Sequence, residues 1–244
     1  PVIGPPLIDA VDYVMFTGST AVGSKVAEQA GRNLIGASME LGGKNAAVVL
    51  ADADLDWTVP ELARGTFGHA GQMCVHTERI YVERGIEAEF TRRFVEHTEQ
   101  LELSTAFEFG PVVSSLITHE HLAEVESHVE DAVAKGASLL TGGKPRPDVG
   151  PLFYAPTILT SVTEIMKLCR GETFGPVVSI YPVSSVDEAV ALANDSDLGL
   201  SFSVWSANTR RAEAIAVRLQ AGTVGVNDGY VATWGSHDAP MGGF

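Results

Sequence analysis

The sequence contains few cysteines, few basic residues and no long apolar run. Cys74 and Cys169 are the only cysteines in 244 residues, which excludes a framework of several disulfides and fits a reducing cytoplasm. Lys and Arg number 16 against 31 Asp and Glu, and the net charge of −15 repels phosphate backbones, so we expect no nucleic-acid partner. No apolar run approaches the ~20 residues of a membrane-spanning helix. With no signal peptide in view, these features predict a cytoplasmic protein without a membrane partner.

The composition is typical of a globular α/β protein, with 45% hydrophobic and 19% charged residues. Segments with strand character alternate with segments of helical periodicity, which predicts parallel strand pairing and an α/β fold. We expect strands at residues 11–17, 46–51, 79–82, 137–140 and 223–227, the first of them buried, and helices at residues 21–31, 59–67, 87–100, 120–135, 185–194 and 210–219. Ser185 and Glu188 have the spacing of a capping box at one of these helix starts.

Two residues stand out for their chemistry. Cys74 closes the run Gly-Gln-Met-Cys at residues 71–74, and Glu40 opens the run Glu-Leu-Gly-Gly-Lys-Asn at residues 40–45. A candidate nucleophile and a candidate carboxylate base are the two halves of covalent catalysis on a carbonyl. Each has an ordinary reading when taken alone, since a free Cys is usually a small buried hydrophobe and a Glu before Gly-Gly can end a strand.

Two further stretches make the pattern specific. Residues 16–23 read Phe-Thr-Gly-Ser-Thr-Ala-Val-Gly, and residues 172–177 read Glu-Thr-Phe-Gly-Pro-Val. In this order, the four stretches resemble the NAD(P)-dependent aldehyde dehydrogenase superfamily, over nearly the whole chain. The nearest resemblance is to the succinate-semialdehyde dehydrogenases, with similar runs at residues 78–83, 150–154, 234–236 and 239–243.

The resemblance implies a division that periodicity does not show. Residues 1–43 are expected to be the last part of a Rossmann-like cofactor-binding domain, residues 44–227 a parallel-sheet catalytic domain, and residues 228–244 a segment that returns toward the cofactor domain. Members of the family are about twice this long. The chain is therefore expected to be a fragment that lacks the N-terminal part and the C-terminal end, with little activity by itself. The full-length protein is expected to be a homo-oligomer.

The resemblance also implies a role for each matching residue. Cys74 would attack the aldehyde carbon and Glu40 would be the general base that activates water, with NAD or NADP as cofactor. The expected cofactor contacts are Gly18 and Ser19 at the pyrophosphate, Gly23 in helix packing, Leu41 and Gly42 beside the nicotinamide pocket, Glu172 at the ribose hydroxyls and Phe174 against the nicotinamide. Phe174 has an alternative reading as a core aromatic.

The substrate implied by the resemblance is an aldehyde that carries a carboxylate, succinate semialdehyde above all. Ser236 matches a serine that helps to hold that carboxylate. Some members carry an arginine six residues before the nucleophile, where this chain has Gly68. Arg64 and Arg170 are the nearest other cations in sequence, and a general aliphatic or aromatic aldehyde remains the alternative substrate.

Other classes of function stay open at this point. The chain could be a binding or assembly module without turnover, or a cysteine hydrolase that pairs Cys74 with a neighbouring histidine such as His69 or His76. Catalytic Cys–His pairs usually join residues that are distant in sequence, which disfavours such a pair. No metal is expected, because the alternating aspartates at residues 52–56 lack the glycine and the distal Glu of a calcium loop.

Overall fold

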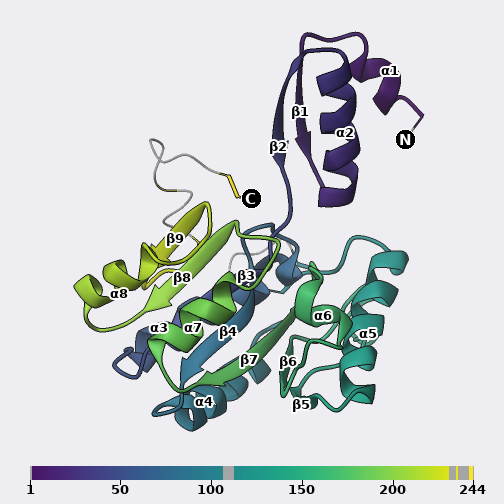
Figure 1. Ribbon diagram of the computed structural model, residues 1–244. Helices are drawn as coiled ribbons and strands as arrows, with labels where there is room; N and C mark the ends of the chain where they lie inside the picture. Colours follow the sequence, from purple (N-terminus) through teal and green to yellow (C-terminus); the bar gives the residue numbers. More distant parts are fainter. Residues whose placement is uncertain (1, 107–112, 231–234, 236–241, 244) are drawn as a thin grey trace. The chain divides into compact units, whose positions relative to one another are not determined.

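The computed structural model describes residues 2–106, 113–230, 235 and 242–243. The chain divides into two compact units, Pro1–Gly42 and Gly43–Phe244. Their elements are labelled in Figure 1. Each unit has its own sheet, of two strands in the first and seven in the second.

The first unit is a strand–helix–strand arrangement preceded by the short helix α1 (Gly4–Ile8). Strands β1 (Tyr13–Thr17) and β2 (Gly36–Glu40) pair in parallel, and helix α2 (Thr20–Arg32) connects them. Parallel pairing needs such a crossover. The register places Thr17 opposite Glu40, so both strands end at the same edge of the sheet.

The expectation that residues 11–17 form a buried strand is wrong in one respect. β1 alternates between exposed and half-buried residues, and Met15 is 80% exposed. Among the described residues, β1 has one hydrogen-bonded neighbour, β2, which leaves its other edge open. An apolar sequence shows that a strand can be buried, but whether the strand is buried depends on which elements pack against it.

The second unit is built on a mostly parallel sheet in the order β5-β6-β7-β4-β3-β8-β9. Its strands are β3 (Asn45–Val49), β4 (Thr77–Glu83), β5 (Ser138–Thr141), β6 (Thr157–Thr160), β7 (Val177–Val183), β8 (Ser201–Trp205) and β9 (Thr223–Val226). All neighbouring pairs are parallel except the edge pair β5–β6. The predicted α/β fold is confirmed.

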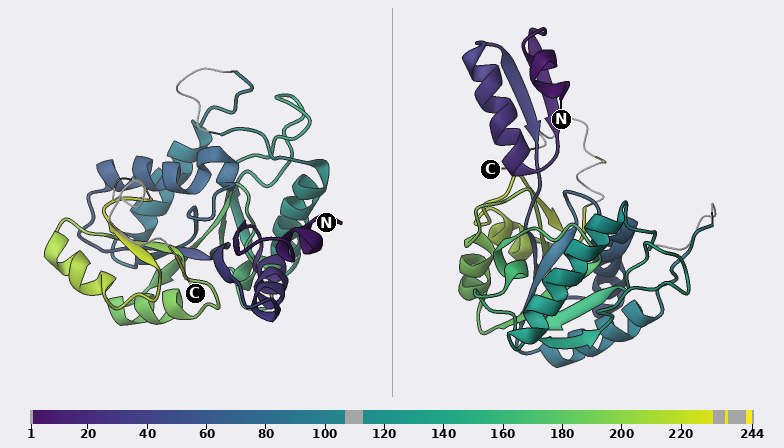
Figure 2. Two further views of the ribbon diagram at one scale, coloured as in Figure 1. Left: turned by 90° about the horizontal axis from the view of Figure 1, so that it is seen from above. Right: turned by 90° about the vertical axis from the view of Figure 1, so that its right-hand side faces the viewer.

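Helices cover both faces of this sheet (Figure 2). The helices are α3 (Leu55–Phe67), α4 (Glu87–Glu99), α5 (His119–Ala134), α6 (Lys167–Arg170), α7 (Val186–Asn194) and α8 (Thr209–Ala216). Ala47 and Val49 of β3 join the core cluster of α3, α4 and α5, whereas Ala46 and Val48 join the cluster of α7 and α8. β3 is therefore buried on both faces, as parallel strands under two helical layers must be.

Helix α3 begins four residues earlier than the expected residue 59. The side chain of Asp54 caps it by accepting a hydrogen bond from the Asp56 N–H at 3.0 Å. Pro60 lies inside the helix, in its second turn. The capping serine of α7 is as predicted, since the Ser185 side chain accepts from the Glu188 N–H at 3.2 Å.

Candidate functional site

The turn that precedes Cys74 has an unusual backbone. Helix α3 is followed by a short 3-10 segment, Gly68–Gly71, in which His69, Ala70 and Gly71 all have φ between 53° and 68°. Such left-handed angles are uncommon for residues with a side chain. A Cβ atom on Gly71 would lie 2.1 Å from the Gly175 carbonyl oxygen, so glycine is required where these two backbone segments meet. Cys74 lies just beyond, half-buried.

Asn45 fixes the backbone around Cys74 from the start of β3. Its buried side-chain amide donates to the Cys74 carbonyl at 2.7 Å and to the His76 carbonyl at 2.8 Å. Its side-chain oxygen accepts from the Ser201 N–H at 2.9 Å. Asn45 was not predicted as a site residue, although a polar residue at the start of an apolar strand is a signal of such a role.

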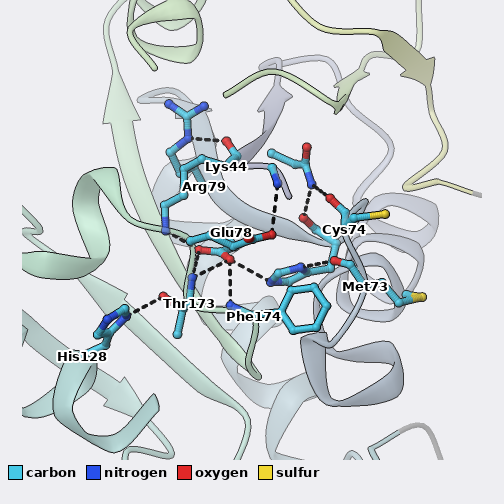
Figure 3. A network of polar contacts seen from close by, with 12 residues as sticks. Lys44, Met73, Cys74, Glu78, Arg79, His128, Thr173 and Phe174 are labelled. Carbon is cyan, nitrogen blue, oxygen red and sulfur yellow. Dashed lines mark hydrogen bonds and ion pairs between the residues drawn. The ribbon is translucent and has the colours of Figure 1, made fainter. Parts of the chain in front are cut away.

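Glu78 is the centre of a buried polar network on β4 (Figure 3). Its carboxylate forms an ion pair with Lys44 and accepts hydrogen bonds from the backbone N–H groups of Thr173 at 2.9 Å and Phe174 at 3.2 Å. His76 Nε2 lies 3.2 Å from the same carboxylate. Burial by itself raises the pKa of Glu78, but Lys44 and His76 outweigh it and hold the pKa well below its usual range.

Glu172 and Phe174 lie on the segment that Glu78 contacts. The half-buried Glu172 accepts a hydrogen bond from the Gly43 N–H at 3.0 Å, and burial raises its pKa although that bond opposes the shift. Phe174 has φ of 51°, and its carbonyl oxygen lies 2.8 Å from His121 Nε2. These contacts bring the predicted residues Cys74, Glu172 and Phe174 into one neighbourhood of the second unit.

The contacts of the His76 ring do not suit it as a catalytic partner of Cys74. Its Nδ1 lies 2.6 Å from the Met73 carbonyl oxygen, and its Nε2 faces Glu78. With Nδ1 at that carbonyl oxygen and Nε2 buried beside Glu78, the geometry argues against His76 as the hydrolase partner of Cys74. Cys169 lies elsewhere, 3.6 Å from a carboxylate oxygen of Glu164. Burial and that carboxylate raise the pKa of the Cys169 thiol.

The remaining predicted residues, apart from Ser236, lie in the first unit. Gly18 and Ser19 form the turn between β1 and α2, and the Gly18 N–H donates to the Glu40 carbonyl at 3.0 Å. Ser19 is the N-cap of α2, but its side chain makes no capping hydrogen bond. Gly23 is buried in the first turns of α2 against the side chain of Leu41, which Gly42 follows. Ser236 lies outside the described residues.

A cavity of about 360 Å³ lies beside the turn that leads to Cys74. Its lining residues are Arg64, Gly68, His69, Ser104, Ala106, Val113, Ser114 and Tyr230. Arg64 pairs with Glu61 through one of its terminal nitrogens, and its other guanidinium nitrogens bond to none of the described residues. Arg170 lies at another cavity and pairs with both Glu164 and Asp195. The structure thus distinguishes the two arginines as candidate ligands for a substrate carboxylate, which the sequence could not do.

Membrane-spanning helices and metal-binding clusters are both absent from the part of the chain that the structure describes. No helix there is long and apolar enough to cross a membrane. No group of three or more His, Cys, Asp or Glu side chains in that part of the chain could hold a metal ion.

The sequence model of the Aldehyde dehydrogenase family matches residues 3–244. This chain belongs to the aldehyde dehydrogenase family. The predicted resemblance is confirmed. The stretches on which the resemblance rested include the turn before Cys74, the Glu172–Phe174 segment and the start of α2.

Relatives within the family extend the comparison. The chain is 54% identical over 242 residues to a Mycobacterium ulcerans protein provisionally named succinate-semialdehyde dehydrogenase (NADP+) 2, and 38% identical over 235 residues to betaine aldehyde dehydrogenase of Bacillus subtilis. These alignments cover 99% and 93% of this chain, but 47% and 48% of the relatives. The chain thus spans about half the length of the relatives it matches.

Solved structures give the same picture. A provisionally named aldehyde dehydrogenase of Anabaena variabilis superposes with a TM-score of 0.91 at 36% identity, over 98% of this chain and 51% of that one. Betaine aldehyde dehydrogenase of Staphylococcus aureus in complex with NAD+ superposes with a TM-score of 0.88 at 34% identity, over 93% and 46% of the two chains.

Proposed function

We propose that this chain carries the reactive thiol of an NAD(P)-dependent aldehyde dehydrogenase that oxidises a semialdehyde acid, with succinate semialdehyde as the first choice. One observation carries the proposal. Cys74 lies half-buried after a turn that Gly71 makes possible, and Asn45 holds its carbonyl group in place. Family membership supports the reaction, and the name of the M. ulcerans relative supports the substrate.

The chemistry proceeds on the sulfur of Cys74. The thiolate adds to the aldehyde carbon, the carbonyl π bond opens, and a thiohemiacetal forms. Loss of hydride from that carbon leaves a thioester. Glu40 then accepts a proton from the water that hydrolyses the thioester, which releases the acid and regenerates the thiol. NAD or NADP, when bound, supplies the hydride acceptor.

The residues proposed to hold the cofactor fit a dinucleotide. Helix α2 is 13 residues long and has no acidic residue in its first turn, so its N-terminal amides suit an anionic pyrophosphate next to Gly18 and Ser19. Glu172 offers a half-buried carboxylate to the ribose hydroxyls. The packing of Leu41 on Gly23 also fits a role for residues 41 and 42 beside the cofactor.

The proposed ligand for the substrate's carboxylate is Arg64. It lines the cavity beside the turn that leads to Cys74, and part of its guanidinium has no bond to the described residues. A guanidinium binds a carboxylate through charge-assisted hydrogen bonds. Arg170 is less suited, because two carboxylates already pair with it.

Cofactor reduction tests this function. A purified protein that contains residues 1–244 is mixed with NAD or NADP and succinate semialdehyde, and NAD(P)H absorbance is followed. We expect Cys74→Ala to abolish NAD(P)H formation and Cys169→Ala to retain it. Glu40→Gln is expected to give a burst of NAD(P)H followed by a steady state slower by about 10²–10⁴-fold. Turnover by Cys74→Ala, or ester hydrolysis without a cofactor as the main activity, would contradict the proposal.

A further inference from the structure

Glu78 is a buried carboxylate whose two oxygens contact two other parts of the chain. Its side chain is 1% exposed, and it lies near the start of β4, four residues after Cys74. Lys44 reaches it from the start of β3, and Thr173 and Phe174 reach it from the segment before β7. Because a buried charge must be paired and hydrogen-bonded, these contacts fix one another.

The segment that Glu78 contacts has a backbone that needs support. Phe174 adopts a left-handed φ of 51° without being glycine. Its N–H donates to Glu78, and its carbonyl oxygen faces His121 Nε2 at 2.8 Å, so both sides of the residue are held. Backbone conformations of this kind persist when the surroundings determine them. Glu78 supplies the acceptor for two consecutive backbone N–H groups there.

The residues at the start of β3 that contact the Glu78 region also contact the backbone of Cys74. Asn45 binds the Cys74 carbonyl, and the adjacent Lys44 binds Glu78 (Figure 3). The Gly43 N–H binds Glu172 at 3.0 Å. Three successive residues of the chain, 43–45, therefore contact Glu172, Glu78 and the Cys74 backbone in turn.

We infer that Glu78 is a positioning residue that sets the Glu172–Phe174 segment relative to Cys74. The inference rests on the proposed function, because that function assigns Glu172 and Phe174 to the cofactor. The negative charge is essential to this role. A neutral glutamine has the same shape, but an NH₂ group in the place of Oε2 cannot accept the hydrogen bonds that Lys44 and the Thr173 N–H donate there, and an NH₂ group in the place of Oε1 cannot accept those from the Thr173 and Phe174 N–H groups.

The test compares Glu78→Gln with the double variant Lys44→Met/Glu78→Gln and with Ile215→Ala. Ile215 is buried on α8 in the core cluster on the other face of the sheet. Its replacement by alanine therefore lowers global stability at a place remote from the Glu78 network, which makes it a control. In a protein that contains residues 1–244, hydrogen exchange is measured for the Thr173 and Phe174 amides, together with the dissociation constants of NAD and NADP.

We expect Glu78→Gln to speed exchange of these two amides by at least about tenfold relative to the amides of β7, and to weaken cofactor binding by a similar factor. Ile215→Ala should leave both ratios unchanged. The double variant removes the stranded Lys44 charge, so it should regain global stability without regaining protection at residues 173 and 174. It also keeps the test decisive if Glu78→Gln alone does not fold.

Two results would overturn the inference. One is exchange at residues 173 and 174 that rises no more in the Glu78 variants than in Ile215→Ala. The other is fast exchange with unchanged cofactor affinity. A failure of the proposed function looks different, because the unsubstituted protein would then bind neither NAD nor NADP while the exchange measurement still reports on Glu78.

Discussion

Arg64 is the residue on which the choice of substrate can be tested. Replacing it with glutamine removes the charge from the cavity but keeps a polar side chain. We expect Arg64→Gln to lower kcat/KM for succinate semialdehyde by about 10–100-fold, the range for loss of a charge-assisted hydrogen bond, and to leave kcat/KM for butanal unchanged. Arg170→Gln is the matched control and should alter neither value. Equal losses for both aldehydes would show that Arg64 acts on folding and not on the carboxylate.

The two thiols should differ in reactivity for a physical reason. Burial and Glu164 raise the pKa of Cys169, so its thiolate fraction at neutral pH is small. We expect iodoacetamide at neutral pH to label Cys74 first, measured by peptide mapping after brief exposure. Glu164→Gln removes the neighbouring charge and should speed labelling of Cys169 only. Faster labelling of Cys169 in the unsubstituted protein would count against Cys74 as the nucleophile.

At the scale of elements, the start of α7 offers a clean measurement of local stability. The Ser185 side chain accepts the Glu188 N–H, which is one of the otherwise unpaired donors at a helix start. Ser185→Ala should destabilise the second unit by about 1 kcal/mol in urea unfolding. Ser127→Ala, inside α5, is the control and should be neutral or slightly stabilising, because alanine is the better helix former. An effect of equal sign and size at both positions would argue against the cap.

The sequence predicted the amphipathic helices well and only part of the sheet, since β3 and β4 were expected but β6, β7 and β8 were not. Helix α4 was expected at residues 87–100 and spans Glu87–Glu99, since one buried stripe per helix leaves a clear pattern. β7 and β8 were not predicted. Strands buried on both faces show no alternation, so only an apolar run can reveal them, as it did for β3.

The candidate site shows a similar limit. Motifs pointed to Cys74, Glu172 and Phe174, all of which the fold gathers in one unit. The role of Glu78 was not predicted, because its partners lie 34 and 95 residues away along the chain and contact it only in the folded protein. Sequence could not rank Arg64 above Arg170 for a similar reason, since the pairing of Arg170 with Asp195 joins residues that are 25 positions apart.

At the scale of the whole second unit, Glu78 should make stability depend on pH. Its pKa is depressed in the fold, so the unfolded chain binds the proton more readily. The stabilisation is therefore complete above the ordinary carboxyl pKa of 4.5 and is lost as pH falls below it. We expect Glu78→Gln to cost about 3–5 kcal/mol at neutral pH, the range for a broken buried ion pair, and the difference from the unsubstituted protein to shrink below about pH 4.5. Urea unfolding across pH measures this, and a difference that stays constant down to pH 3 would contradict it.

The pairing of β3 with β8 has a consequence for how the chain is made. Val49 lies opposite Trp205, and the Asn45 side chain bonds to Ser201, 156 residues further along. At about 5–20 residues per second, a ribosome needs roughly 8 to 30 seconds to add that much chain. Throughout that interval one edge of β3 has no partner strand from its own molecule, and an unpaired apolar edge readily joins other chains. Yield of the native protein in cells should therefore depend on translation speed and on chaperones that shield nascent chains.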